Sequence, residues 1–238
     1  MNRKWDTLPS RRTVHWRTRA VMAAAATLFL MPGISRAETE QEQFVEKAKL
    51  TLQAFAADPS VKDELRAWSK EAKGLFVVPQ LLRGAFVFGG AGGSGVLVVR
   101  DEKTGAWSQP AFYNIGAVTF GLQAGGDASE LVFVVRTQRG LEQFYRSDFK
   151  LGADTGLSIG PVGGSASVAG ITADIVSYGR TKGAFAGMAL DGAVVAVSDE
   201  SNERYYGKPV RPVDILVKNA VSNPKSAELH VAAGGLMK

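Results

Sequence analysis

The sequence contains no cysteine and only two histidines, and these shortages exclude several kinds of chemistry. Without a thiol there is no disulfide, no thiolate nucleophile, and no cysteine-ligated zinc or iron–sulfur cluster. The histidines are His15 and His230, so a histidine-rich metal site is excluded and a Ser–His–Asp triad would depend on His230. We interpret His230 as a surface or packing residue. We therefore predict a protein that is not an enzyme and that has no catalytic residue, metal or cofactor.

Long apolar runs are also missing, because the run Ala20–Met31 is shorter than the roughly 20 residues of a membrane-spanning helix. The run follows a basic segment and precedes Ser35-Arg36-Ala37, which offers small residues at the −3 and −1 positions. This layout predicts an export signal over residues 1–37, cleaved after Ala37. Ser10-Arg11-Arg12 leaves the twin-arginine route open beside the general one. We expect a periplasmic protein that is peripheral to the membrane.

A basic excess is absent from the remainder of the chain, although the whole sequence has a net charge of +5. Residues 38–238 contain 21 basic and 22 acidic residues, because seven of the basic residues precede residue 38. A general nucleic-acid binder carries its excess of cations on the folded domain. We therefore exclude nucleic acid as a partner.

Residues 38–238 are expected to form a single domain that begins with two helices, within residues 38–73. Phe44, Ala48, Leu52 and Phe55 recur at helical spacing over Glu38–Ala57. A second helix is predicted over Pro59–Lys73, with Asp58 as the N-cap, Pro59 at the first helical position and Gly74 at the end.

The second helix has an apolar stripe that includes Leu65 and Trp68, and a separate basic stripe. The basic stripe consists of Lys62, Arg66, Lys70 and Lys73. One interpretation is a membrane-facing helix whose cations meet phosphates while Trp68 lies at the interface. The other is an ordinary surface helix with solvated charges, since Asp63, Glu64 and Glu71 dilute the positive potential.

From Leu75 the pattern changes to short β segments between glycine turns, which predicts a β core over residues 75–200. Tight reversals are expected at Asp101–Gly105, Gly125-Gly126-Asp127 and Asp191-Gly192. The predicted strands are Leu75–Val78, Ala85–Phe88, Val96–Arg100, Trp107–Tyr113, Ala117–Gln123, Leu131–Arg136, Leu157–Ile159, Ala166–Ala169, Ala173–Tyr178, Ala184–Leu190 and Ala193–Val197.

Further helices are predicted over Gly140–Ser147, Pro212–Val221 and Pro224–Ala233, so the terminal helices fall within residues 212–233. Helices at both ends of a β core indicate an α+β fold rather than alternating βαβ units. Many glycines within strands favour a strongly curved, mainly antiparallel sheet, barrel-like and nearly closed, with the helices packed on it.

Several motifs that suggest chemistry fail on their context. Gly90–Gly95 matches G-x-G-x-x-G, but a β-branched strand follows it where dinucleotide binding requires a helix, so we expect a glycine-rich bend between strands. There is no phosphate loop, and Ser94 lacks the helix and the histidine of a hydrolase nucleophile. The acidic residues Asp199, Glu200 and Glu203 are expected in a solvated loop. Trp107–Pro110 is interpreted as part of a core-filling strand that could also line a pocket.

In their order along the chain, several segments resemble the SYLF family of lipid-binding and actin-binding domains. The resemblance covers roughly residues 44–235. The matching segments are AKGLFVVP (72–79), GAFVFGGAGGSGVLVVR (84–100), GAWSQPAFYNIG (105–116), FGLQAGGDASELVFVV (120–135), KLGADTG (150–156), GPVGG (160–164), YGRTKGAFAGMALDGAVV (178–195) and YYG (205–207).

The resemblance implies a non-enzymatic module that binds anionic phospholipid, including phosphatidylinositol lipids in eukaryotic members, at a membrane surface. It also implies that the matching glycines and WSQP define the fold rather than contact a ligand. Actin is not expected as a partner of an exported protein, and a structural or protein-interaction module of the cell envelope is the alternative. The implied lipid-binding residues are Lys62, Arg66, Lys70, Lys73 and Trp68 of the second helix, together with Arg83 and Lys182.

Overall fold

A computed structural model describes residues 38–85, 88–120, 125–159, 172–181 and 190–237. The predicted leader 1–37, the predicted strand Ala166–Ala169, Lys182, and residues 184–189 of the predicted strand Ala184–Leu190 lie outside these ranges. Within the described ranges, no helix is both long enough and apolar enough to cross a membrane.

The first helix, α1 (Glu40–Ala57), confirms the predicted amphipathic pattern. Ala48, Leu52 and Phe55 are completely buried along one side of α1, and Phe44 packs against the same cluster. The Thr39 hydroxyl accepts a hydrogen bond from the Glu42 backbone N–H, and the Glu42 carboxylate accepts one from the Thr39 N–H. This reciprocal capping satisfies two backbone donors that helix geometry leaves free.

The second helix, α2 (Lys62–Lys70), is shorter at both ends than the sequence predicts. Asp58 accepts hydrogen bonds from the backbone and hydroxyl of Ser60 and thereby forms a turn, so Asp58 is not the N-cap and Pro59 is not in the helix. The cap position belongs to Val61. At the other end, the backbone N–H of Lys73 bonds to the Val135 carbonyl, which draws the chain into the sheet before Gly74.

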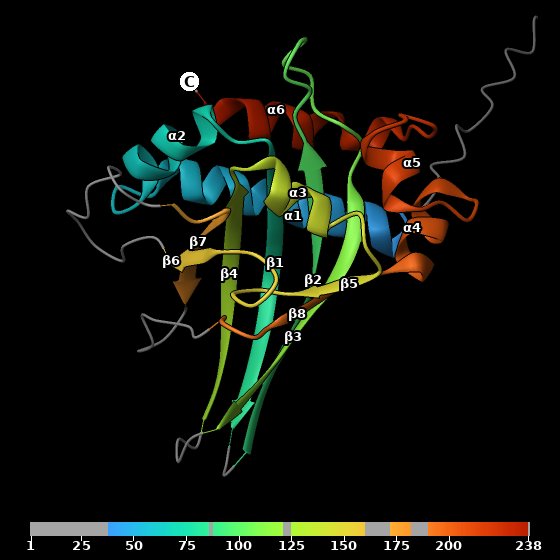
Figure 1. The fold of residues 1–238 in the computed structure, drawn as a ribbon. Helices are drawn as coiled ribbons and strands as arrows, with labels where there is room; N and C mark the ends of the chain where they lie inside the picture. Colours follow the sequence, from blue (N-terminus) through green and yellow to red (C-terminus); the bar gives the residue numbers. More distant parts are fainter. Residues whose placement is uncertain (1–37, 86–87, 121–124, 160–171, 182–189, 238) are drawn as a thin grey trace, which may run out of the picture. The chain divides into compact units, whose positions relative to one another are not determined.

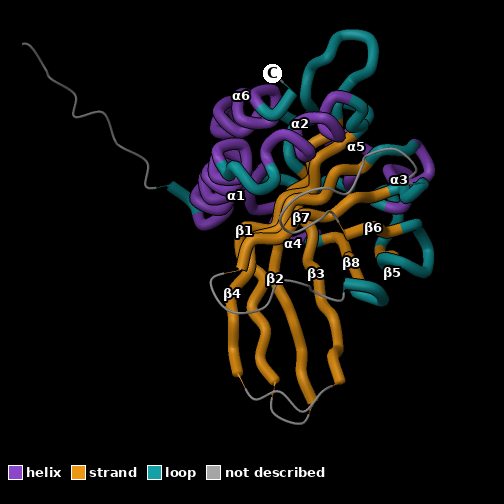
Figure 2. Tube along the Cα trace, turned by 90° about the vertical axis from the view of Figure 1, so that its left-hand side faces the viewer, coloured by secondary structure: helices purple, strands orange, loops and turns teal. Residues whose placement is uncertain are grey.

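The strands form one sheet in the order β5-β8-β3-β2-β1-β4-β7-β6, so the predicted α+β fold is confirmed. All of the pairings are antiparallel except β6–β7. The sheet curves strongly into a half-barrel with helices on its sides (Figure 2). The strands are β1 (Gly74–Ala85), β2 (Phe88–Val99), β3 (Ala111–Phe120), β4 (Gly125–Val135), β5 (Asp148–Lys150), β6 (Leu157–Ile159), β7 (Ile175–Thr181) and β8 (Val194–Val197).

The central strands β1–β4 are longer than predicted. The first of them, β1, continues through Pro79. Proline cannot donate to a β ladder and is tolerated in a central strand only at an irregularity. The register of β1 against both neighbours shifts at this point, between Val77 and Gln80 on one side and between Val78 and Leu81 on the other. The bulge therefore accommodates Pro79 and lets β1 run on to Ala85.

Glycines predicted to form bends lie inside strands. Gly90–Gly95 belongs to β2, and Gly125–Asp127 belongs to β4. A Cβ on Gly93 would lie 2.3 Å from the carbonyl oxygen of Gln80 in the bulge, and a Cβ on Gly95 would lie 2.5 Å from the Phe76 ring. These two glycines are required because β1 approaches β2 too closely for a side chain. The other expected turns are correct: Gly105 and Gly192 have φ of +73° and +80°.

Each face of the sheet has its own hydrophobic core. On the first face, α1, α2 and α6 (Ala227–Gly235) cover Val77, Val96 and Val132. On the second face, α3 (Gln138–Gln143) and α5 (Pro212–Leu216) bring Leu141 and Ile215 against Phe133 and its neighbours. Figure 1 shows α1 behind the central strands and α3 in front of them.

The remaining helices differ in extent from the prediction. The helix predicted over Gly140–Ser147 ends at Gln143, and the helix predicted over Pro212–Val221 shortens to α5. The helix predicted over Pro224–Ala233 consists of a 3₁₀ turn, Pro224–Ser226, followed by α6, which extends to Gly235. The acidic residues of 199–203 were wrongly assigned to a loop. They form the start of α4 (Asp199–Tyr206), where acids are favoured by the helix dipole.

Candidate functional site

A strip of three cations lies along α2. Lys62 is partly exposed and Arg66 and Lys70 are exposed, and positions four apart on a helix differ by only about 40° around its axis. No ion pair joins any of the three to an acid within the described ranges. We refer to Lys62, Arg66 and Lys70 as the cationic strip. Its charges are available to an external anion.

Lys73 does not extend this strip, because it follows the end of the helix. Its ammonium group forms an ion pair with Glu102 in the loop after β2. Arg100, from the same region, donates a hydrogen bond to the Lys70 carbonyl at 3.3 Å. These contacts hold the end of α2 against the β2–β3 loop, and Lys73 serves this attachment.

Trp68 lies in the core rather than at the surface, with only 2% of its area exposed. Arg136 follows the end of β4, and its guanidinium lies 3.9 Å from the centre of the Trp68 ring, which is a cation–π contact. Arg136 also approaches Glu71 at 3.8 Å. In this structure Trp68 therefore fixes α2 to the sheet and does not belong to an exposed membrane-facing surface.

The underside of α2 adds a polar contact to this apolar anchor. Burial raises the pKa of the Tyr178 hydroxyl, and the neighbouring Glu64 carboxylate raises it further. Tyr178 therefore remains neutral at physiological pH beneath the helix. Together with Leu65, which is completely buried, it makes α2 a fixed platform for the cationic strip.

Arg83 lies elsewhere. It is nine residues beyond Gly74 along β1, which corresponds to about 30 Å of strand, and it lies on the face opposite α1. Its guanidinium is 4.0 Å from the carboxylate of Asp127 on β4, and both side chains are mostly buried. Arg83 therefore does not join the cationic strip, and Lys182 lies outside the described ranges.

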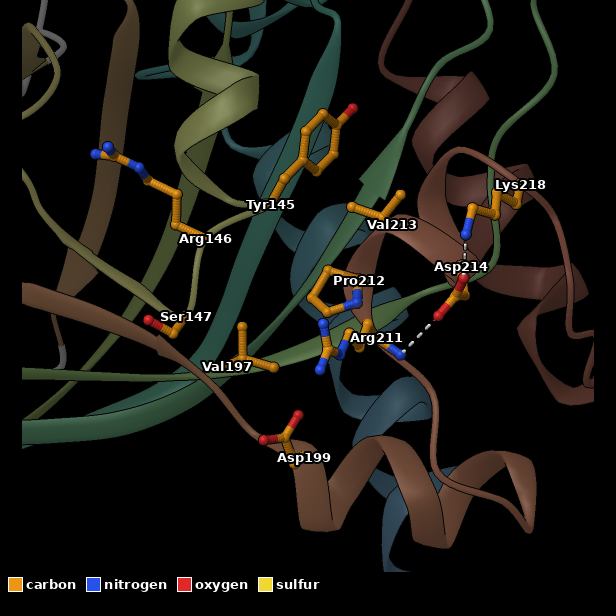
Figure 3. Close-up of a pocket in the computed structure, with 10 residues that line it drawn as sticks. All are labelled: Tyr145, Arg146, Ser147, Val197, Asp199, Arg211, Pro212, Val213, Asp214 and Lys218. Atoms are coloured by element: carbon orange, nitrogen blue, oxygen red, sulfur yellow. Dashed lines mark hydrogen bonds and ion pairs between the residues drawn. The ribbon is translucent and has the colours of Figure 1, made fainter.

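A pocket of about 660 Å³ opens between the α3–β5 connection and α5. Figure 3 shows Tyr145, Pro212 and Val213 on its apolar side. Its charges are mixed, since Lys218 donates to Asp214 at 2.9 Å and Asp199 lies across from Arg211. This balance gives the pocket no clear preference for an anion or a cation.

A second concavity, a groove of about 560 Å³, lies between α1 and the sheet. Phe44, Leu50 and Ala54 form its helix wall, and Pro79 and Ala128 lie on its sheet side. Leu50 is 52% exposed at the edge of this groove. Lys47 and Arg180 also line this groove, so it combines apolar walls with cations. Sequence analysis missed it because it joins segments that are distant in sequence.

Three of the described carboxylates have a pKa below the ordinary value, not the raised pKa of a general acid. Hydrogen bonds lower the pKa of Asp58, Asp101 and Asp214, so these groups are ionised at neutral pH. Burial lowers the pKa of His230. Within the described ranges, no group of three or more histidine, aspartate or glutamate side chains could hold a metal ion.

The WSQP segment is engaged within the fold. The Gln109 side-chain carbonyl accepts hydrogen bonds from the Asn223 backbone N–H at 3.0 Å and the Ser226 hydroxyl at 2.9 Å. The Tyr206 hydroxyl donates to the Pro110 carbonyl at 2.6 Å. These bonds tie the start of β3 to the C-terminal helices, in agreement with a fold-defining role. Half-buried Trp107 packs against the first core and also lines a pocket of about 510 Å³.

These features define a class of protein: an α+β module with a half-barrel sheet and flanking helices. It has a cationic strip on α2 and an apolar groove between α1 and the sheet. The chain belongs to the SYLF family, also called Ysc84, as its sequence suggests. The family model, described as "Las17-binding protein actin regulator", matches residues 116–233.

The relatives are described as binding or regulatory proteins. The chain is 34% identical over 163 residues to LAS seventeen-binding protein 3 of Saccharomyces cerevisiae, covering 65% of this chain and 34% of that protein. It is 32% identical to Protein YSC84 of the same yeast, covering 65% and 33%. It is 31% identical to the SH3 domain-containing YSC84-like protein 1 of Mus musculus, covering 66% and 47%. The chain thus spans between a third and a half of these relatives, and no solved structure gives a significant match.

Proposed function

We propose that this SYLF domain is a non-enzymatic module that binds anionic phospholipid at a membrane surface through the cationic strip of α2. The observation that carries the proposal is that Lys62, Arg66 and Lys70 are aligned on one helix, whereas Lys73, Arg83 and Arg136 form ion pairs with acids of the domain. Phosphate headgroups are the anions that such a strip meets at a bilayer.

The attachment of α2 supports this role. Leu65 and Trp68 hold the helix against the sheet, so the backbone positions of the three cations are fixed before they meet a ligand, which reduces the entropy lost on binding. Residues 38–238 are close to neutral, so long-range attraction to the bilayer is weak and the local strip supplies the affinity. Each cation near an anionic bilayer contributes about 1 kcal/mol, and three contribute about 3 kcal/mol.

The triple variant Lys62→Glu, Arg66→Glu, Lys70→Glu is expected to lower affinity for anionic vesicles by about a hundredfold or more. The loss arises from removal of three attractions and the addition of three repulsions. The measurement is co-sedimentation with vesicles of phosphatidylglycerol and phosphatidylcholine, over a series of anionic fractions and salt concentrations.

The matched control reverses three exposed cations at the opposite side of the domain: Lys150, Arg146 and Lys208. Figure 1 places β5 and the α4–α5 connection on the side away from α2. The control changes the net charge equally and should bind vesicles nearly as well as the original chain. Equal losses in both triple variants would show that net charge, not the strip, governs binding.

A protein-interaction module is the second candidate, and the description of the family model and the name of one yeast relative, LAS seventeen-binding protein 3, favour it. Under this hypothesis a partner contacts a helix surface and lipid is not required. Capture of one defined partner from envelope extract, unchanged after detergent removes lipid, would favour this function over the first.

We also propose a cellular location for this binding, and the predicted leader alone supports it. Export with cleavage after Ala37 would place the domain in the periplasm or cell envelope, peripheral to the membrane. The mass of the chain recovered from the periplasmic fraction tests this directly, since a mature protein should begin at Glu38.

A further inference from the structure

The far ends of β1–β4 present a sheet surface on which four of seven residues are glycine. Successive residues of a strand point to opposite faces of the sheet, and paired residues of neighbouring strands point to the same face. The residues that follow lie on the face that α1 covers at the other end of these strands. Beyond the bulge, Leu82 pairs with Gly92 and Ala128, and Gly92 pairs with Gly116. In the next row on this face, Gly84 pairs with Gly90, and Gly90 with Val118. We call these seven residues the bare face.

Nothing within the described fold requires glycine at these positions. A Cβ on Gly84 would meet no atom within 4 Å, and on Gly90, Gly92 and Gly116 the nearest atoms would be at 3.8, 4.0 and 3.8 Å. None of them has the positive φ that favours glycine, unlike Gly105 or Gly192. They differ in this from Gly93 and Gly95 on the opposite face, which close packing explains. Glycine inside a strand without such a reason marks either a tight bend of the sheet or a site that a ligand or another backbone approaches closely, and the exposed apolar neighbours Leu82 and Val118 favour the second.

The chemistry of the bare face selects an apolar ligand. Its described side chains are Leu82, Ala128 and Val118, and Leu82 and Val118 are 55% and 75% exposed. The N–H and C=O groups of a sheet lie in its plane and bond to the neighbouring strands, so the face offers a ligand no backbone hydrogen bonds. Figure 2 shows these strand ends running past α1, with no described helix over them.

The bare face leads into the groove beside α1, because Ala128 belongs to both. On β2 and β3, polar residues separate the bare face from the groove: the Ser94 hydroxyl donates to the Asn114 side-chain oxygen at 2.9 Å. At the groove, Arg180 lies between Asp58 at 3.7 Å and Glu130 at 3.8 Å. Lys47 has no such acid among the described residues and provides a cation for an anionic group.

We propose that the bare face and the adjoining groove bind the acyl chain of an anionic amphiphile, with its carboxylate or phosphate near Lys47. The glycines let the flexible chain lie directly on the sheet, while Leu50 and Phe44 close over it from α1. This extends the proposed lipid binding from headgroup to tail, but it uses residues separate from the cationic strip, so the two proposals can fail independently.

The test uses the fluorescent fatty acid cis-parinaric acid, without vesicles. The original chain should increase its fluorescence saturably. The triple variant Gly90→Val, Gly92→Val, Gly116→Val fills the bare face and should weaken uptake at least tenfold, and so should Val118→Asp. Gly235→Val, at an open position on α6, should bind as the original does. The Glu variants of the cationic strip should also retain uptake while losing vesicle binding.

Four results would overturn the inference. The first is no uptake by the original chain, and the second is equal uptake by the filled variants. The third is a lower thermal midpoint of the triple valine variant than of the original, which would show that the chain itself packs on the face. The last is a dimer in sedimentation that the valines convert to monomer, which would make a second copy the occupant.

Discussion

Replacing Asp174 by alanine is expected to destabilise the domain by about 3–5 kcal/mol, because this carboxylate joins three segments. Its side chain is 4% exposed and accepts hydrogen bonds from Arg139 at 3.0 Å, the Gly156 backbone N–H at 2.9 Å and the Thr155 hydroxyl at 3.3 Å. The Thr137 hydroxyl, which caps α3, donates to it at 2.5 Å. Removal leaves Thr155 and Gly156 with unsatisfied donors, and chemical unfolding measures the loss.

The same group predicts a loss of stability in acid. Burial opposes the charged form, but bonds from Arg139, Thr137 and Gly156 outweigh it and lower the pKa of Asp174 from 3.8 to about 2. A lowered pKa stabilises the fold above the unfolded-state value, and the contribution is lost as pH falls from about 4 through 2. The loss corresponds to about 2 kcal/mol. Asp174→Asn should lack this part of the acid response, whereas exposed Asp148→Ala should keep it.

Gly93→Ala is the second substitution with a large expected effect, about 3 kcal/mol or more of destabilisation. Its Cβ would lie 2.3 Å from the Gln80 carbonyl oxygen and 3.2 Å from the Leu81 Cα. Both are backbone atoms of a central strand, so the clash is relieved only by moving the β1 bulge away from β2. Thermal unfolding should show a midpoint lower by several degrees.

The neighbouring residue supplies the control for this prediction. In Gly92→Ala the new Cβ would point to the opposite face, where the nearest atom is 4.0 Å away. It should be neutral or stabilising by about 0.5 kcal/mol, because alanine loses less backbone entropy than glycine. Similar midpoints for the two variants would contradict the strand register and the assignment of faces.

Local signals predicted much of the fold. The sequence predicts α1 from its helical spacing and predicts terminal helices around a β core, and both predictions are confirmed. The bulge at Pro79 was not predicted, because proline normally ends a strand and only the pairing partners show that β1 continues. For α4 the signals were present: acids in the first turn, Arg204 in the last and a glycine, Gly207, directly after it.

The candidate site was only partly accessible from sequence. Helical spacing located Lys62, Arg66 and Lys70, but it could not show that Lys73 pairs with Glu102 or that Trp68 is covered. Such contacts arise between segments that meet only in the fold. The sequence does not distinguish the glycines of β2 from one another, and only the packing against Gln80 and Phe76 separates the required glycines from the open ones.

The most direct measurement of the central claim follows α2 itself at a bilayer. The chain has no cysteine, so a single cysteine at exposed Ala67 on α2, or at exposed Lys150 on β5, accepts one environment-sensitive fluorophore. We predict that phosphatidylglycerol vesicles shift the emission of the Ala67 label to the blue, reversibly with salt, and leave the Lys150 label unchanged. No shift at Ala67, or the same shift with purely zwitterionic vesicles, would contradict binding of anionic lipid through α2.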